Sequence, residues 1–344
     1  MPTLPELDIT SNTNNSPHVL ILGAGASLAA FPNGEKNGLK LPLMNNLVEV
    51  LGIEPVIAKH GLEYGGENFE VTYDALVRSG QHPCLVEEID EVVETYFSKM
   101  QLPDEATLYD YLVLSLRNKD IIATFNWDPF LAQAFQRNMN VIGYGQMPRM
   151  AYLHGNVVIG ICTTCKTKGW RWNVCDRCNN RFSPSKLLYP VSKKKYSADE
   201  FLLDEWDGLL RHIQRAYFIT VFGYSAPVTD AEAKKLMSDV WQQNTTRDLA
   251  QIDLIDIKPR VEVKNNWFDF FVPRNYGIYS NFFDTYLSTH PRRSCDAFAM
   301  ATLQQHPWRD NHFPKDLTLS ELQDWVLPLV EEEKAGKLSG EPCS

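Results

Sequence analysis

The chain has 344 residues, 44% of them hydrophobic and 22% charged, with a formal net charge of −10. This composition predicts a globular protein with one large domain carrying insertions, or two domains, and the acidic balance argues against direct nucleic-acid binding. No apolar run is long enough to span a membrane and the polar N-terminus is unlike a secretory signal, so we expect a cytoplasmic protein.

The N-terminal half begins with a polar arm and a strand-to-helix turn. Residues 1–17 are rich in Pro, Asn and Ser and predict a disordered arm. The apolar run 18–22 (HVLIL) then meets GAGAS at 23–27, the pattern of a buried strand that turns sharply into a helix. From about 43 to 118, apolar residues recur at helical spacing, which predicts a helical insert.

Later apolar runs alternate with helical segments. The strands predicted in this part of the chain are 120–125, a short one at 151–155, 217–223 and 251–257. Strands separated by helices imply right-handed crossovers and a parallel sheet with helices on both faces. We therefore predict an α/β fold with a Rossmann-like sheet over residues 18–260, followed by a mainly helical extension, 261–344. Near its end, Thr318 and Glu321 form a capping-box pattern, and Pro328 predicts a kink or stop.

The GAGAS turn is a candidate phosphate loop. Gly23 and Gly25 allow the backbone to approach a pyrophosphate at the start of a helix. The third glycine of the common dinucleotide fingerprint is absent, because positions 28–30 read LAA. Taken alone, the motif fits a purely structural turn as well.

A second motif, TFNWD at 124–128, lies at the carboxyl end of a predicted strand, where ligands bind in open α/β sheets. Its Asn126 and Asp128 are candidate site residues, although either fits a cap for the helix that starts near Pro129. His154 follows another strand; it fits either a structural residue or a base that titrates near neutral pH.

Four cysteines form the strongest single pattern, within a predicted insert at 157–186. They make two CxxC pairs nine residues apart: Cys162, Cys165, Cys175 and Cys178. Four thiolates supply a tetrahedral Zn²⁺ site, and a full set of four protein ligands leaves no open position, so this metal is expected to be structural. Two disulfides or an iron–sulfur site are the alternatives.

Two further strand ends carry polar or small residues. Gly223 and Ser225, in FGYSAP, suit the ribose or phosphate of a ligand. Asp256 ends the last predicted strand, where a carboxylate accepts from an adenosine ribose hydroxyl in dinucleotide folds. Asp230 is expected to cap the next helix.

Five motifs follow one another along the chain: GAGAS, TFNWD, LHGN, the CxxC…CxxC insert and FGYS. In this order they resemble the sirtuin superfamily from residue 18 to about 260. The resemblance implies a Rossmann domain with helical and zinc inserts and NAD as substrate. Protein-deacylating sirtuins carry G-I-P-D-F-R after the phosphate loop, whereas 29–34 here read AAFPNG, and the helical part is larger. The chain looks more like the sirtuin-like NAD hydrolases of bacterial anti-phage defence.

That resemblance implies cleavage of the nicotinamide–ribose bond with water as acceptor. Asn126 would position the water and the ribose, Asp128 would orient the neighbouring hydroxyls, and His154 would act as general base. The groups implied to hold the rest of the dinucleotide are Gly23, Ala24, Gly25 and Ser27 on the pyrophosphate, and Gly223 and Ser225 on the adenosine side. The alternatives are an NAD-dependent protein deacylase or ADP-ribosyltransferase, and a non-catalytic sensor of NAD or ADP-ribose.

Unrestrained NAD hydrolysis would be toxic to the cell that makes the enzyme. We therefore expect restraint through a homo-oligomer, an activating partner protein, or both. The implied role is depletion of NAD once infection is sensed.

Overall fold

The fold is described from a computed structural model that covers residues 15–191, 199–226, 230–271, 275–336 and 338. Most of the N-terminal arm predicted at 1–17 lies outside these residues. Among the residues described, no helix combines the length and the apolar character that crossing a membrane requires.

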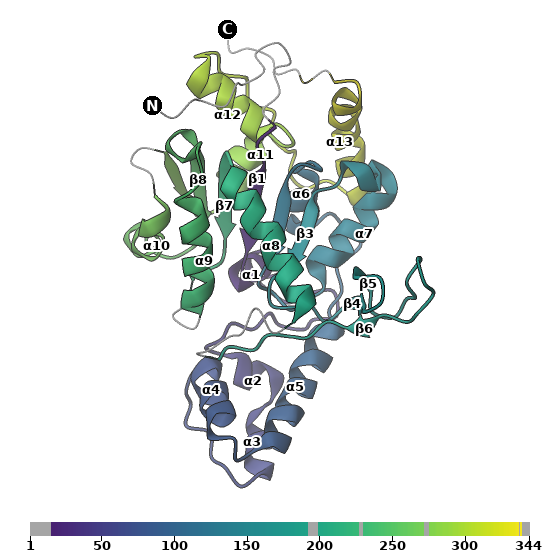
Figure 1. Ribbon diagram of the computed structural model, residues 1–344, viewed down its shortest axis with the longest axis vertical. Coiled ribbons are helices and arrows are strands. Elements are labelled where there is room, and N and C mark those ends of the chain that lie inside the picture. Colours follow the sequence, from purple (N-terminus) through teal and green to yellow (C-terminus); the bar gives the residue numbers. More distant parts are fainter. Residues whose placement is uncertain (1–14, 192–198, 227–229, 272–274, 337, 339–344) are drawn as a thin grey trace.

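Six strands form one parallel sheet in the order β3-β2-β1-β7-β8-β9 (Figure 1). They are β1 His18–Leu22, β2 Ile121–Thr124, β3 Arg149–Tyr152, β7 Phe218–Phe222, β8 Gln251–Ile255 and β9 Tyr276–Tyr279. Counted along the chain among themselves, they follow the order 3-2-1-4-5-6 of doubly wound dinucleotide-binding folds. The order reverses between β1 and β7, so the crevice of the fold opens at the carboxyl ends of these two strands.

Both faces of the sheet are covered, as predicted. Alternate residues of β1 point to opposite sides: Leu20 and Leu22 join one core cluster, and Val19 and Ile21 join the other. The first cluster also contains residues of three helices: α6 (Leu108–Leu114), α7 (Phe130–Ile142) and α13 (Leu319–Lys334). Helices α8 (Glu200–Arg215), α9 (Ala231–Trp241) and α10 (Arg260–Asn266) contribute to the second.

The helices predicted between 43 and 118 are present, but they belong to two environments. Four of them are grouped at one end of the molecule (Figure 1): α2 Leu47–Leu51, α3 Glu54–Lys59, α4 Phe69–Ser79 and α5 Pro83–Ser98. A left-handed Gly52 separates α2 from α3. The last helix, α6, packs beside α7 against the sheet instead.

The cysteine-rich insert folds as a small antiparallel sheet of its own, in the order β5-β4-β6. Its strands are β4 Ile159–Cys162, β5 Thr167–Trp170 and β6 Ser183–Pro184. Side chains of β5 and the residue after it connect the insert to its surroundings: Lys168 pairs with Glu205 of α8 at 2.7 Å, and Arg171 with Glu94 of α5.

The C-terminal segment contributes more than helices. It carries α10, α11 (Tyr286–Thr289), α12 (Ser294–Leu303) and α13, but it also supplies β9, the outer strand of the main sheet. The sequence did not predict β9, because four half-buried residues with a central glycine give too short a period-2 signal. The capping box at Thr318 and Glu321 is confirmed, whereas Pro328 neither ends nor interrupts α13, which continues to Lys334.

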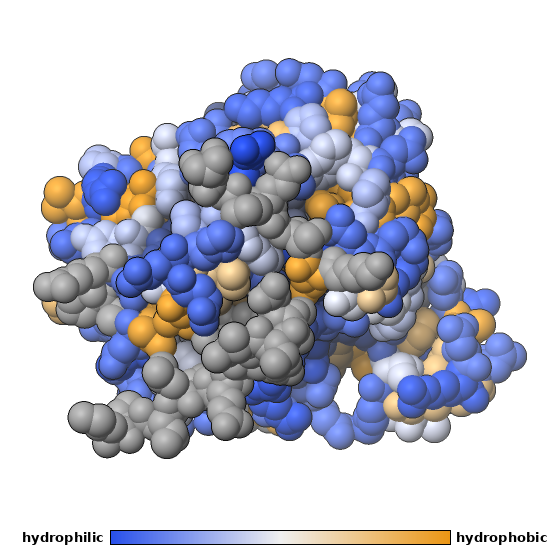
Figure 2. Space-filling view, turned by 90° about the horizontal axis from the view of Figure 1, so that it is seen from above, coloured by the Kyte–Doolittle hydropathy of each residue, from blue (hydrophilic) through white to orange (hydrophobic). Residues whose placement is uncertain are grey.

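A buried arginine fastens this extension to the sheet domain. Arg292 is 1% exposed, donates to the Leu116 carbonyl at 2.8 Å, and forms an ion pair with Glu333 of α13 at 2.6 Å. Such a buried charge is stable only because both its hydrogen bonds and its counter-ion are supplied. At this end of the molecule the described surface is mainly hydrophilic, with hydrophobic residues in separate groups (Figure 2).

Candidate active site

The turn after β1 packs directly against the end of β7. The N–H of Gly23 donates to the Phe222 carbonyl at 3.0 Å, and that of Gly25 to the Gly223 carbonyl at 2.9 Å. A Cβ on Gly23 would lie 2.6 Å from the Gly223 oxygen, and one on Gly25 would lie 2.7 Å from the Gly223 Cα. The glycines therefore permit two loops to meet at the point where the strand order reverses.

This packing limits what the turn offers to a ligand. Two of the N–H groups expected near a pyrophosphate, those of Gly23 and Gly25, already donate to protein carbonyls. The structural interpretation of GAGAS, left open by the sequence, thus has direct support. Pyrophosphate binding by Gly23, Ala24, Gly25 and Ser27 stays a prediction.

Gly223 offers a test of this close packing. Its φ is +63°, and a Cβ there would lie 2.2 Å from the Ala26 nitrogen, a backbone atom that cannot move aside cheaply. We expect Gly223→Ala to lower the free energy of unfolding by about 2–4 kcal/mol, from backbone strain plus overpacking. Chemical denaturation measures this. Gly52→Ala is the matched control, because Gly52 has φ +67° but open space around a Cβ; equal losses in both variants would contradict the packing argument.

Asn126, Ser27 and Asp128 meet in one buried hydrogen-bond network at the ends of β1 and β2. The Asn126 Nδ2 donates to the Gly23 carbonyl at 3.0 Å and to the Ser27 Oγ at 2.9 Å. The Ser27 hydroxyl donates to the Asp128 Oδ2 at 2.6 Å. All three side chains are less than 9% exposed. The sequence predicted that Asn126 and Asp128 lie at this edge, but it assigned Ser27 to the pyrophosphate.

The amide orientation of Asn126 follows from its partners. A backbone carbonyl accepts and cannot donate, so the Asn126 atom facing Gly23 O must be the nitrogen. Both amide hydrogens are then used inside the protein. The atom that Asn126 can offer to a ligand is its carbonyl oxygen, Oδ1.

Asp128 contacts both the start of a helix and the site network. Its Oδ1 accepts from the N–H of Phe130, the first residue of α7, at 3.3 Å, although Pro129 and not Asp128 occupies the N-cap position, and its Oδ2 accepts from Ser27. Burial raises the pKa of Asp128 to about 6, against the lowering effect of the hydrogen bond from Ser27. The carboxyl therefore changes charge just below neutral pH.

His154 lies on the neighbouring strand end, after β3. Its ring meets the Phe125 ring edge-on, with centroids 4.8 Å apart, which places it beside the residue that precedes Asn126. Its Nε2 lies 3.8 Å from Oδ1 of Asp230, and both side chains are buried. Gly155 then turns the chain with φ +73°, where a Cβ would lie 2.2 Å from the Lys186 carbonyl.

Asp230 was expected only as a helix cap. It does occupy the N-cap position of α9, but its side chain makes no capping hydrogen bond. Instead its carboxylate accepts from the Tyr224 hydroxyl at 3.1 Å and faces His154. A carboxylate that faces the ring in this way holds its orientation, which is the support a general base needs.

Asn156, the last residue of LHGN, was assigned no role from the sequence. It is 1% exposed, and its Nδ2 donates to the Asp128 carbonyl at 2.7 Å. Its own N–H donates to the Ser185 hydroxyl at 3.0 Å. Because the Leu188 N–H donates to the His154 carbonyl at 2.9 Å, the segment returning from the cysteine-rich insert supports the site. A cavity of about 470 Å³ adjoins this segment and is also lined by α4 and α5.

Two residues predicted to contact the adenosine half of the ligand take no part in this network. Ser225 follows Gly223 at the end of β7 and is partly exposed. Asp256 follows β8, where its Oδ1 accepts from the Lys258 N–H at 2.9 Å and shapes the turn. Contact of either residue with a ribose stays a prediction.

The four cysteines converge as predicted. The sulfur atoms of Cys162, Cys165, Cys175 and Cys178 all lie within 4.8 Å of one another. Four sulfurs about 2.3 Å from a tetrahedral Zn²⁺ are about 3.8 Å apart, so this cluster fits the ion. The Sγ atoms of Cys162 and Cys178 are 3.3 Å apart, too far for a disulfide. With four protein ligands, the site fits a structural Zn²⁺ rather than a catalytic one.

Comparison with known proteins gives structural neighbours only. No protein-family profile and no curated protein matches the chain. A solved complex of Sir2 with a p53 peptide and NAD⁺ is 16% identical and has a TM-score of 0.38, covering 88% of this chain and 98% of its own. A Sir2 homologue–NAD complex is 15% identical, covers 88% and 95%, and has a TM-score of 0.33. At these values the likeness does not establish membership of a family.

Proposed function

We propose that this protein is an NAD hydrolase that cleaves the nicotinamide–ribose bond and releases nicotinamide and ADP-ribose. The observation that carries the proposal is the fixed Asn126 amide. Both its hydrogens are held by Gly23 and Ser27, which leaves Oδ1 as the atom that Asn126 can offer to a ligand, and the preceding residue, Phe125, meets the ring of His154. The strand order and the order of the motifs along the chain support NAD as the ligand.

The reaction needs an oxygen atom that accepts hydrogen bonds at this position. Departure of nicotinamide leaves positive charge on the ribose, and an amide oxygen both stabilises that charge and orients the attacking water. His154, facing Asp230, takes the proton from the water or from a ribose hydroxyl. Asp128 acts through Ser27, because both its carboxylate oxygens accept from protein donors.

Two features favour water over a peptide as acceptor. The residues at 29–34 lack the Asp-Phe-Arg stretch of the protein-deacylating sirtuins that the motif order resembles. The helical group α2–α5 is larger than the resemblance to a deacylase predicts. By the same resemblance we propose that the hydrolase acts in the cytoplasm of a bacterium, as a defence effector that depletes NAD when activated.

The pKa of Asp128 predicts the pH dependence. Ser27 donates to an ionised Asp128, so protonation of this carboxyl reorganises the network that holds Asn126. Its folded-state pKa is about 6, and we therefore expect kcat/KM to fall as pH decreases through about 6, approaching tenfold per unit below it. A pH series between 5 and 8 measures this. A profile that stays flat across this range would contradict the role of Asp128.

The proposed reaction is tested by chromatography of NAD, nicotinamide and ADP-ribose after incubation with the purified protein over a range of concentrations. We expect nicotinamide and ADP-ribose in equal amounts, and neither in His154→Ala. Nicotinamide release only with an acyl-lysine peptide would instead identify a deacylase. NAD binding without turnover at every concentration, with any partner added, would identify a sensor.

Assembly is the second part of the proposal. We infer that activity is restrained until a homo-oligomer forms or a partner protein binds, because unrestrained hydrolysis would deplete the NAD of the cell that makes the enzyme. Light scattering together with specific activity tests this. Specific activity should rise with oligomer formation; a monomer that is fully active alone would contradict it.

A further inference from the structure

We infer that Tyr109 of α6 is a positioning residue for the proposed hydrolysis, because its hydroxyl fixes the direction of the hydrogen bonds that hold Asn126. The inference rests on the proposed function and extends it to a residue of the helical segment. Tyr109 lies 82 positions from Ser27 in the sequence, yet its hydroxyl is 2.6 Å from the Ser27 Oγ and 3.4 Å from the Asn126 Nδ2.

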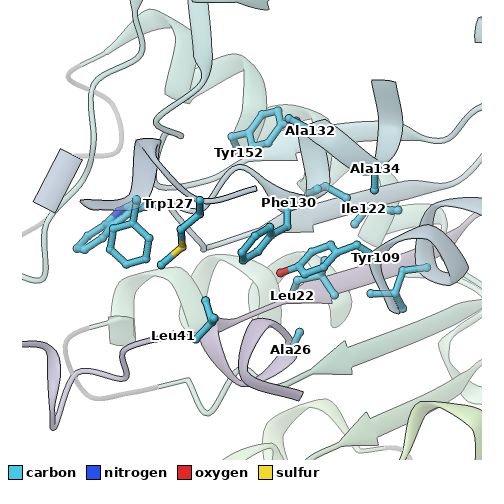
Figure 3. Close-up of a cluster of buried hydrophobic side chains, with 14 of the residues drawn as sticks. Leu22, Ala26, Leu41, Tyr109, Ile122, Trp127, Phe130, Ala132, Ala134 and Tyr152 are labelled. Atoms are coloured by element: carbon cyan, nitrogen blue, oxygen red, sulfur yellow. The ribbon is translucent and has the colours of Figure 1, made fainter. Parts of the chain in front are cut away.

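Packing holds the Tyr109 ring in one place. The residue is 1% exposed and lies next to Leu22 and Phe130 in the core (Figure 3). Its ring centroid is 5.6 Å from that of Phe130 and 6.5 Å from that of Phe31. Hydrophobic residues would fill this position as well as a tyrosine does, so the packing alone gives no reason for the hydroxyl.

The next residue fastens α6 to α7. Asp110 completes a capping box with Thr107, accepts from the Arg137 Nε at 2.7 Å, and accepts from the Asn138 Nδ2 at 2.8 Å. Helix α6 is therefore held rigidly beside α7, the helix whose first N–H donates to Asp128. Rigid support of this kind is what a positioning residue requires.

Donor and acceptor accounting gives the hydroxyl its function. The Ser27 oxygen has one hydrogen and two lone pairs, and it has three neighbours. Asn126 Nδ2 only donates, and an ionised Asp128 only accepts, so Ser27 accepts from Asn126 and donates to Asp128. One lone pair remains, and the Tyr109 O–H donates to it. With this single arrangement every group around Ser27 is satisfied.

The arrangement depends on the charge of Asp128. If this carboxyl is protonated, its O–H competes to donate to Ser27, the Ser27 hydrogen turns toward Tyr109, and the single arrangement is lost. Two phenols are buried near Asp128, Tyr109 from α6 and Tyr152 from β3. Burial raises the pKa of both, and the charge of Asp128 adds to this effect, together with that of Glu205 at Tyr152. By donating to Ser27, Tyr109 strengthens the Ser27–Asp128 hydrogen bond and so favours the ionised carboxylate.

The test removes one oxygen atom. Tyr109→Phe keeps the ring but leaves Ser27 with a lone pair that no donor fills. We expect kcat on the pH-independent plateau to fall roughly five- to tenfold with KM for NAD within about twofold, and the acid limb to move up by roughly 0.5–1 pH unit. Tyr111→Phe is the matched control on the same helix: it loses a hydrogen bond to the Pro314 carbonyl, remote from the network. Tyr111→Phe should leave both values unchanged.

A readout without turnover separates this inference from the proposed function. Carboxyl-carbon NMR of the aspartates, with Asp128→Asn for assignment, follows the titration of Asp128 directly. An upward shift of that titration in Tyr109→Phe but not in Tyr111→Phe supports the inference, even if the wild-type protein never releases nicotinamide, a result that would contradict the hydrolase alone. If the wild type hydrolyses NAD and Tyr109→Phe matches Tyr111→Phe in kcat, pH profile and Asp128 titration, the inference is wrong and the hydrolase stands.

Discussion

Replacing Asn126 by alanine is expected to lower kcat for NAD hydrolysis roughly 100- to 1,000-fold, because it removes the oxygen that orients the water and stabilises the charge of the ribose. KM should change little, since Asn126 acts on the reacting atoms rather than on the adenosine end. The measurement is the initial rate of nicotinamide release at saturating NAD. Asn126 is buried and donates to the Gly23 carbonyl and to Ser27, so thermal unfolding of the variant is measured beside its activity to show that the loss of rate is not a loss of fold.

A second variant, Asn126→Asp, tests whether the amide hydrogens are needed to place this oxygen. Aspartate keeps an oxygen at the same place but cannot donate to the Gly23 carbonyl or to Ser27. It also adds a charge beside Asp128. We expect it to be as inactive as Asn126→Ala. Asn118→Ala is the matched control, because it removes a side-chain amide that bonds Gly145 O at the opposite end of β2. Full activity in Asn126→Asp would show that the amide hydrogens have no part in placing the oxygen.

The fold could be predicted from the sequence where the local signal was strong. β1 was predicted to the residue, since five apolar residues run directly into a glycine turn. The cysteine cluster followed from spacing alone, because two CxxC pairs leave few other ways to bring four sulfurs together. β9 and the path of α13 through Pro328 depend on tertiary packing, and their local signals were weak or pointed to another structure.

Only the site residues that lie at the ends of strands could be predicted from the sequence. Asn126, Asp128 and His154 could be placed at one edge because parallel strands end together. Tyr109 could not be placed there, because a tyrosine on the apolar side of a helix indicates a core position. Its hydrogen bond to Ser27, 82 positions away, has no signal in the sequence. Asp230 was assigned as a helix cap for the same reason: its position in the sequence fixes the N-cap, while the direction of its carboxylate is set by Tyr224 and His154.

Loss of the metal is expected to affect the proposed reaction, although the four cysteines leave a zinc ion no catalytic position. The insert is a three-stranded sheet with little core of its own, so its folding depends on the ion. The segment that leaves it supports the site, through the Ser185 hydroxyl bonded to Asn156 and through Leu188 bonded to the His154 carbonyl. Unfolding of the insert therefore removes contacts from the loop after β3, which carries both His154 and Asn156.

We expect a chelator to remove one Zn²⁺ per chain, to increase hydrogen exchange throughout residues 157–188, and to lower NAD hydrolysis at least about tenfold. Added Zn²⁺ should restore all three. Cys175→Ala should reproduce the loss without a chelator, whereas Cys84→Ser, a change at an exposed cysteine of α5, should not. If the metal leaves and exchange rises while turnover stays at the wild-type rate, the insert does not support His154 and Asn156, and the contacts from Ser185 and Leu188 only close the surface of the domain.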